Sequence, residues 1–159
     1  MMAPAPESQH HWLQRLIGDW TYSCEVAMKP GESPVTMTGT ESIRSLGDLW
    51  ILAEGSTQAP DGTPGATLLT LGYDPAKSSF VGTWIGSMMT TLWVYTGRLE
   101  GDSLILDTVG PDHSDPAQTR KYQETITLKG DDHRVFSSAV QNDDGSWNTM
   151  MTIEYRRVK

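Results

Sequence analysis

Cysteine and histidine are scarce in this sequence. Cys24 is the single cysteine among 159 residues, which excludes an internal disulfide bond and a zinc site built from several cysteines. None of the 4 histidines lies on the apolar face of an expected strand, and we expect His10 and His11 to be solvated. We therefore predict no metal and no cofactor, haem included.

Basic residues and long apolar runs are also few. Lysine and arginine total 12 against 20 aspartates and glutamates, for a net charge of −8. A protein of this charge repels nucleic acid and anionic membranes, and no run approaches the ~18 apolar residues of a membrane helix. The first residues, MMAPAPESQHHW, lack the basic and apolar regions of a signal peptide. These features predict a cytoplasmic protein whose partners are neither nucleic acid nor membrane.

The abundant residues favour β-structure. The 18 threonines and 6 tryptophans suit half-buried strands. Apolar and polar residues alternate from Trp20 to Met28, until Pro30 and Gly31 interrupt the pattern. Turn residues, mainly glycine and aspartate, separate most of the later apolar segments, so we expect about ten strands with short connections. The expected strands are residues 20–28, 35–46, 49–58, 66–73, 79–86, 92–99, 103–109, 120–128, 134–141 and 147–157.

One segment before the strands has a helical pattern. Its apolar residues between Trp12 and Ile17 fall on one stripe, and Gly18 follows as a stop. A helix this short is stable only when it packs on another surface. The predicted domain spans residues 1–159, with the helix at 7–17 and the barrel at 18–158.

Short connections between consecutive strands favour an up-and-down order, because strands that follow each other usually pair. A flat sheet of about ten strands would expose two long edges, and closing the sheet removes both. We therefore predict an all-β protein with a closed antiparallel barrel, and a β-sandwich is the alternative fold. Such a barrel is wider than one whose interior is just filled by side chains, so it predicts a lumen that can hold a small ligand.

Several motifs resemble a known family of barrels. Gly18-Asp19-Trp20 opens the first strand and resembles the G-x-W signature of calycins, the superfamily of lipocalins and fatty-acid-binding proteins. The resemblance implies that Trp20 lies at the closed end of the barrel against a basic residue of the last strand, for which Arg157 is the expected partner. The sequence from residue 12 to residue 157 also resembles the DUF1579 family of bacterial proteins of unknown function, which implies a calycin-like β-barrel and no settled activity. The similar segments are residues 16–20, 39–42, 71–74, 84–88, 97–101, 121–124 and 151–156.

Two acidic residues lie on the apolar side of expected strands, a position that points into the barrel. Glu41 shares a face with Ile43, and Glu124 shares a face with Ile126. Burial raises the pKa of an unpaired carboxyl group, which can then hold the polar head of a ligand or move a proton. The alternative for both is a structural role, with the carboxylate held by Arg157, a tyrosine or the backbone.

Aromatic residues supply candidates for the wall of a ligand cavity. Rings that carry polar atoms suit an amphipathic ligand, and ordinary core packing is the alternative for each of them. Met88 and Met89 lie between two strands and form either a flexible lid over the open end or a plain hairpin turn. The aromatic candidates are Trp84, Trp93, Tyr95 and Tyr122.

Motifs of several enzyme classes are missing. The sequence has no G-x-S-x-G elbow, P-loop or G-x-G-x-x-G motif, which argues against a serine hydrolase, a nucleotidase and a Rossmann dehydrogenase. We predict a binding protein, rather than an enzyme, that takes a small apolar or amphipathic molecule into its lumen. One alternative is a non-catalytic interaction protein, such as a homodimer, with Trp50, Leu52 and Glu54 on an outer face. The other is a barrel isomerase or cyclase in which Glu41 or Glu124 is the acid/base.

Overall fold

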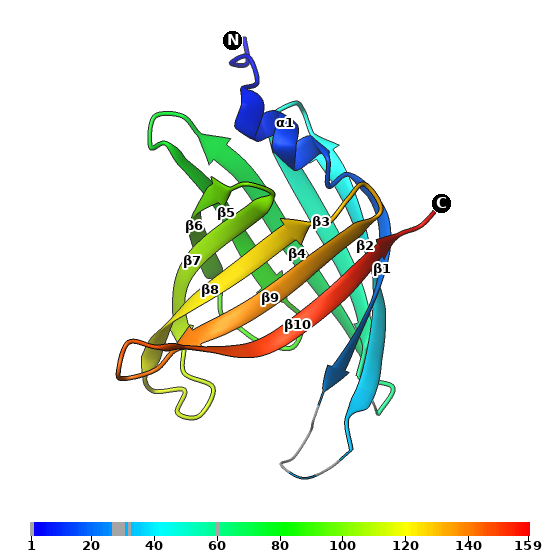
Figure 1. Ribbon diagram of the computed structural model, residues 1–159, viewed down its shortest axis with the longest axis vertical. Helices are drawn as coiled ribbons and strands as arrows, with labels where there is room; N and C mark the ends of the chain where they lie inside the picture. The colour runs from blue at the N-terminus through cyan, green and yellow to red at the C-terminus, as the bar shows by residue number, and fades with distance from the viewer. Residues whose placement is uncertain (1, 27–30, 32, 60) are drawn as a thin grey trace.

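The computed structural model describes residues 2–26, 31, 33–59 and 61–159, which form one short helix and ten strands (Figure 1). The expected extension of the first strand to Met28 and its interruption at Pro30 lie outside the described residues. The elements are α1 (Ser8–Gln14), β1 (Gly18–Val26), β2 (Val35–Leu46), β3 (Trp50–Gln58), β4 (Pro64–Asp74), β5 (Ser79–Gly86), β6 (Trp93–Glu100), β7 (Ser103–Pro111), β8 (Thr119–Leu128), β9 (His133–Gln141) and β10 (Trp147–Arg157).

The strands form a closed antiparallel barrel in which neighbours in sequence are neighbours in space. The barrel closes where β10 pairs with β1, with Arg157 opposite Trp20 and Tyr155 opposite Tyr22. Figure 1 shows β1 and β10 side by side although they come from opposite ends of the chain. Closure pairs both edges of every strand, so the predicted barrel is confirmed and the sandwich alternative is wrong.

The helix α1 lies across one end of the barrel (Figure 1) and is shorter than predicted, ending at Gln14. The expectation that His10 is solvated is wrong, because this side chain is 3% exposed. Its Nδ1 accepts a hydrogen bond from the backbone N–H of Glu7 at 2.8 Å, and its Nε2 lies 3.0 Å from the carbonyl oxygen of Tyr73. His10 therefore ties α1 to β4.

The pairing register determines which side chains face the interior, because directly opposed residues lie on the same face of a sheet. Trp20 is buried inside the barrel, and Glu41 lies opposite it on β2. On the other side of the barrel, Glu124 lies opposite the buried Leu106 of β7. Both acidic residues therefore face inward.

A bulge in β10 changes one expected face. The register between β10 and β9 shifts between Thr149 and Met151, so Met151 opposes Ser138 whereas Trp147 opposes Gln141. An extra residue in one strand reverses the alternation of side chains beyond it. Strict alternation along the last strand would place Trp147 on the same face as Met151, Ile153, Tyr155 and Arg157, but the bulge places Trp147 on the opposite face from Met151.

The interior is packed at the α1 end and around Trp93, Tyr95 and Tyr122 of β6 and β8, and it is accessible to solvent over the rest of the other end. The packed part joins the apolar stripe of α1 to the inner side chains of the strand ends beneath it. Its residues include Trp12, Leu13, Leu16, Trp20, Ile43, Ile51, Leu71, Phe80, Leu104, Ile126 and Leu128. Partly buried or exposed inner side chains are those of Tyr22, Cys24, Met37, Thr57, Leu69, Trp84, Glu124 and Met151. Because these side chains face inward, we call this part of the barrel the accessible half of the interior.

Candidate functional site

The six residues predicted to bind a ligand all lie on the inner face of the barrel, but they do not form one cluster. Glu41 lies at the α1 end, next to the buried Trp20. Trp84 and Trp93 oppose each other across β5 and β6, nearer the other end. The remaining residues lie on β6 and β8, the two strands that flank β7. They are Tyr95, Tyr122 and Glu124.

The fully buried Trp20 anchors the α1 end of the barrel. Its Nε1 donates a hydrogen bond to the carbonyl oxygen of Leu16 at 2.9 Å, and the guanidinium carbon of Arg157 lies 4.3 Å from its ring centroid. Arg157 also donates to the carbonyl oxygen of Ile17. Gly18 has a φ of +140°, and a Cβ there would lie 2.3 Å from Arg157 Nη1, so only glycine fits at this crossing.

Glu41 forms a buried ion pair with Arg134 of β9. The side chains of Glu41 and Arg134 are 11% and 4% exposed. The guanidinium carbon of Arg134 lies 3.7 Å from the ring centroid of Tyr155 and 4.8 Å from that of Trp20. The partner of Glu41 is therefore Arg134 rather than Arg157, and this carboxylate is already occupied.

None of the ion pairs among the described residues involves Glu124. It lies directly opposite Ser138 on β9, and its buried Oε2 has no hydrogen-bond partner in the described part of the chain. Burial raises the pKa of Glu124 to about 7, and a hydrogen bond with Ser138 opposes part of this effect. Burial also raises the pKa of Tyr95, and the negative charge of Glu124 adds to that increase. Glu124 is thus a carboxyl group near half-ionisation at neutral pH, inside an accessible part of the barrel.

A second buried polar atom near Glu124 lacks a partner. Thr108 of β7 is 6% exposed, and its Oγ1 makes no hydrogen bond. Thr108 lies opposite Tyr122, one inward position away from Glu124 along β8. Buried polar atoms are normally paired, so two orphans at neighbouring positions mark a place where a ligand atom or a water would be stabilised.

The aromatic residues build one wall of the interior. The rings of Trp93 and Tyr122 meet edge to face with centroids 5.2 Å apart, and the Tyr122 hydroxyl donates to the carbonyl oxygen of Pro111. Trp93 lies against Gly110, where any Cβ would clash with the indole at 2.1 Å. Trp93 Nε1 also donates to the sulfur of Met89 at 3.2 Å. Trp93 and Tyr122 are therefore held rigidly, whereas Trp84 is only partly buried.

Sequence reasoning missed Arg134, Ser138 and Thr108. On β9, Arg134 and Ser138 share the inner face with Phe136, but Val135 and Ala139 make the outer face equally apolar. The alternation therefore gave no signal for the direction of these polar side chains. Only the pairing with β8 shows that they face inward.

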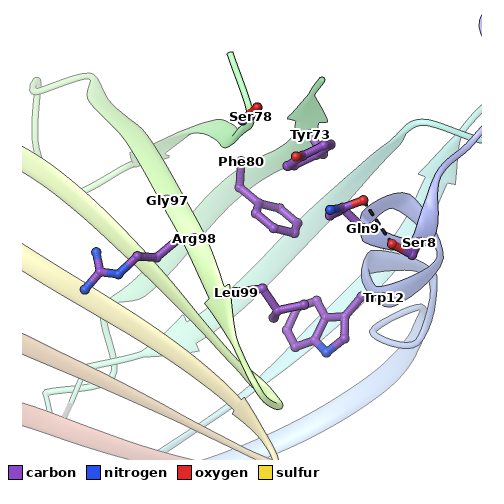
Figure 2. A pocket seen from close by; sticks show the side chains of 9 residues that line it. All are labelled: Ser8, Gln9, Trp12, Tyr73, Ser78, Phe80, Gly97, Arg98 and Leu99. Atoms are coloured by element: carbon purple, nitrogen blue, oxygen red, sulfur yellow. Dashed lines mark hydrogen bonds between the residues drawn. The ribbon is translucent and has the colours of Figure 1, made fainter. Parts of the chain in front are cut away.

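A separate hollow of about 380 Å³ lies between α1 and the ends of β4, β5 and β6 (Figure 2). In Figure 2 the Phe80 ring lies between Tyr73 and Trp12, whereas the Arg98 side chain points away from these rings. Arg98 is paired with Asp107 at 3.2 Å on the outer face. The hollow is thus aromatic and has no charged group directed into it. Its lining is Ser8, Gln9, Trp12, Tyr73, Ser78, Phe80, Gly97, Arg98 and Leu99.

The residues proposed for an outer face do lie outside the barrel. Trp50 is 41% exposed and covers Gly72, where a Cβ would meet its ring at 2.5 Å. Glu54 is paired with Arg44 at 3.3 Å, and both side chains are largely exposed. Leu52 lies between them in sequence and shares their face.

Within the described ranges, no group of three or more histidine, cysteine, aspartate or glutamate side chains is arranged to hold a metal ion. No helix in the same part of the chain has the length and apolar character needed to span a bilayer.

Comparisons with known proteins place the chain in a family and identify its fold. The model of a family described as "Protein of unknown function (DUF1579)" matches residues 5–157. The crystal structure of Rv2717c from M. tuberculosis is similar, with 14% identity and a TM-score of 0.61 over 98% of this chain and 100% of that chain. A redesigned β-barrel, mFAP1, bound to DFHBI, matches with 14% identity and a TM-score of 0.47 over 92% of this chain and 97% of that chain. Among curated proteins, none matches this sequence.

Proposed function

The chain belongs to the DUF1579 family of proteins of unknown function, and from the geometry of its barrel we propose that it binds a small apolar or amphipathic molecule in the accessible half of the interior. The observation that carries this proposal is Glu124, an inward carboxyl group whose Oε2 has no partner. Ligand sites combine apolar walls with a few polar groups that orient the ligand. Trp84 and Tyr95 supply apolar wall, and Glu124 supplies the polar group.

The other inward groups have structural roles in this proposal. Glu41 is neutralised by Arg134, so it is not free to bind a polar head group. Trp20 and Arg157 close the α1 end, where Trp20 is completely buried. Trp93 and Tyr122 contact each other and stiffen the wall beside the accessible half. A ligand would therefore lie between this wall and the partly buried side chains of β1 and β2.

The experiment that tests the proposal uses N-phenyl-1-naphthylamine, an uncharged dye whose fluorescence rises in apolar surroundings. We expect the dye to bind and to raise the melting temperature, because a ligand of the folded state stabilises it by mass action. The variant Leu69→Trp places an indole on the accessible inner wall and should abolish binding. Leu68→Trp is the matched control, since Leu68 pairs with Ile85 on the outer face. An unchanged melting temperature, or equal binding by both variants, would contradict the proposal.

A second candidate function, association with another copy of the chain, is favoured by apolar side chains on the outer face of β5, β6 and β7. Ile85, Val94 and Val109 are 47%, 57% and 59% exposed, and Leu92 beside them is 59% exposed. Contiguous exposed apolar side chains are typical of protein interfaces. Sedimentation analysis over a wide concentration range should show a dimer that Val94→Lys dissociates, and a monomer at every concentration would exclude this function.

A further inference from the structure

The polar environment of Glu124 indicates which kind of head group the interior would accept. Its Oε2 and the Thr108 hydroxyl are both buried without a partner among the described residues; the ionised carboxylate only accepts hydrogen bonds, and the hydroxyl can accept or donate, so a ligand atom that donates would satisfy both. A carboxylate ligand could accept from Thr108, but it would bring a second negative charge and further acceptors next to Glu124. Hydrogen-bond complementarity therefore favours a donor over an anion at this position.

The positive charges of the inner face are already paired. Arg134 is bound to Glu41 in the packed part of the barrel, and its buried Nε, which has no hydrogen-bond partner among the described residues, lies four residues along β9 from the position opposite Glu124. Arg120, at the start of β8, donates to Asp112 at 2.7 Å and to Asp143 at 2.8 Å. An anionic head group would have to break one of these pairs, which would leave a buried carboxylate without its partner. The interior therefore offers an anion no free cation among the described inner residues.

The aromatic wall also favours positive charge. Trp84, Trp93 and Tyr95 lie on the adjacent strands β5 and β6, which are separated from β8, the strand of Glu124, by β7. The faces of aromatic rings attract cations, most strongly where water is excluded. The Glu124 carboxylate and the aromatic rings would thus both attract a bound cation.

We propose that the preferred ligands of the accessible half are hydrophobic amines, with the ammonium group donating to Glu124 and Thr108 and the apolar part lying along Trp84 and Tyr95. This inference rests on the proposed function and specifies its ligand class. The overall charge of −8 acts in the same direction, because it attracts cations from solution and repels fatty-acid anions.

The ionisation of Glu124 would couple amine binding to pH. The titratable groups that act on it are Tyr95 from β6 and Tyr122 from its own strand, and burial raises the pKa of both phenols, so neither carries charge at neutral pH. The facing positions of β7 and β9 are the uncharged Leu106 and Ser138. Amine binding should therefore strengthen from pH 6 to pH 8, as Glu124 ionises through its pKa of about 7.

The test compares three probes with the same chain length: octylammonium chloride, octan-1-ol and sodium octanoate, each titrated calorimetrically into the full chain at pH 7.5. We expect octylammonium to bind at least about tenfold more tightly than octanoate, with octanol between them. Glu124→Gln should reduce octylammonium affinity by about tenfold and leave octanol affinity within about twofold. Glu54→Gln is the control, since Glu54 is an exposed outer carboxylate.

Each outcome separates the inference from the proposed function. Binding of octanol without a preference for octylammonium over octanoate would overturn the inference and leave the proposed function intact. An amine preference that survives in Glu124→Gln would also overturn it, because the preference would then not come from this carboxylate. Failure of all three probes and of the uncharged dye to bind would overturn both.

Discussion

Arg134 and Glu41 form a buried ion pair across the interior, although residue 134 lies on β9 and residue 41 on β2. The pair connects two strands that are not adjacent, because β1 and β10 lie between them. Trp20 and Tyr155, on those two intervening strands, contact the guanidinium with their rings. Of the two inward carboxylates, Glu41 is thus paired with a cation in the packed part of the barrel, whereas Glu124 Oε2 has no partner among the described residues.

We expect Glu41→Gln to destabilise the protein by about 3–5 kcal/mol, because it leaves the Arg134 cation buried without a counter-charge. The double variant Glu41→Gln with Arg134→Met removes both charges and should recover most of the lost stability. Urea unfolding followed by tryptophan fluorescence measures both effects. Equal stability of Glu41→Gln and the wild type would show that the ion pair does not form.

Stability should fall with rising pH because of Glu124. Its pKa is about 7 in the folded state against 4.5 for the ordinary group, so the folded state holds the proton more tightly than the unfolded state. The contribution is fully present below pH 4.5 and is lost as pH rises through 7, with a magnitude on the order of 3 kcal/mol.

The variant Glu124→Gln isolates the contribution of Glu124 to the pH dependence of stability, because glutamine does not titrate. The melting temperature of the wild type minus that of Glu124→Gln should fall by roughly 5–10 °C between pH 4.5 and pH 8. Glu54→Gln, on the outer face, should show no comparable trend. A difference that does not change with pH would mean that Glu124 is not buried as described.

Cys24 reports on access to the interior, because its side chain faces inward and is the single thiol of the chain. Burial raises the pKa of Cys24, which lowers its thiolate fraction and slows its reaction with N-ethylmaleimide. We expect reaction at least about tenfold slower than for Ser23→Cys in a Cys24→Ser background, since Ser23 is exposed on the outer face. N-phenyl-1-naphthylamine should slow the reaction of Cys24 alone. Equal protection of both thiols would argue against binding inside the barrel.

Arg157→Lys should cost about 1–3 kcal/mol, because lysine cannot donate together to the carbonyl oxygens of Arg15 and Ile17 while covering Trp20. Arg156→Lys is the matched control, since this neighbour is exposed and should change stability by less than about 0.5 kcal/mol. Thermal unfolding of the two variants provides the comparison. Similar losses for both would show that the contacts of Arg157 do not stabilise the α1 end.

Period-two patterns predicted the strands and the closed barrel because both faces of each strand repeat regularly along the chain. The same alternation identified Glu41 and Glu124 as candidates, and the structure places both on the inner face. The difference between them was not predictable, because the partner of Glu41 is residue 134, far away in sequence. The outward position of Trp147 depends on a bulge in β10, and the burial of His10 depends on its contact with Tyr73. Each of these features depends on pairing between segments that are distant in sequence, which a local sequence pattern does not predict.

The seam between β1 and β10 has a kinetic consequence. Its register joins residue 20 to residue 157, so the barrel cannot close until β10 has been synthesised. Contacts between such distant residues slow folding, because a large loop must be ordered before they form. During translation the growing sheet would expose the free edge of β1 to other chains until β10 emerges and pairs with it.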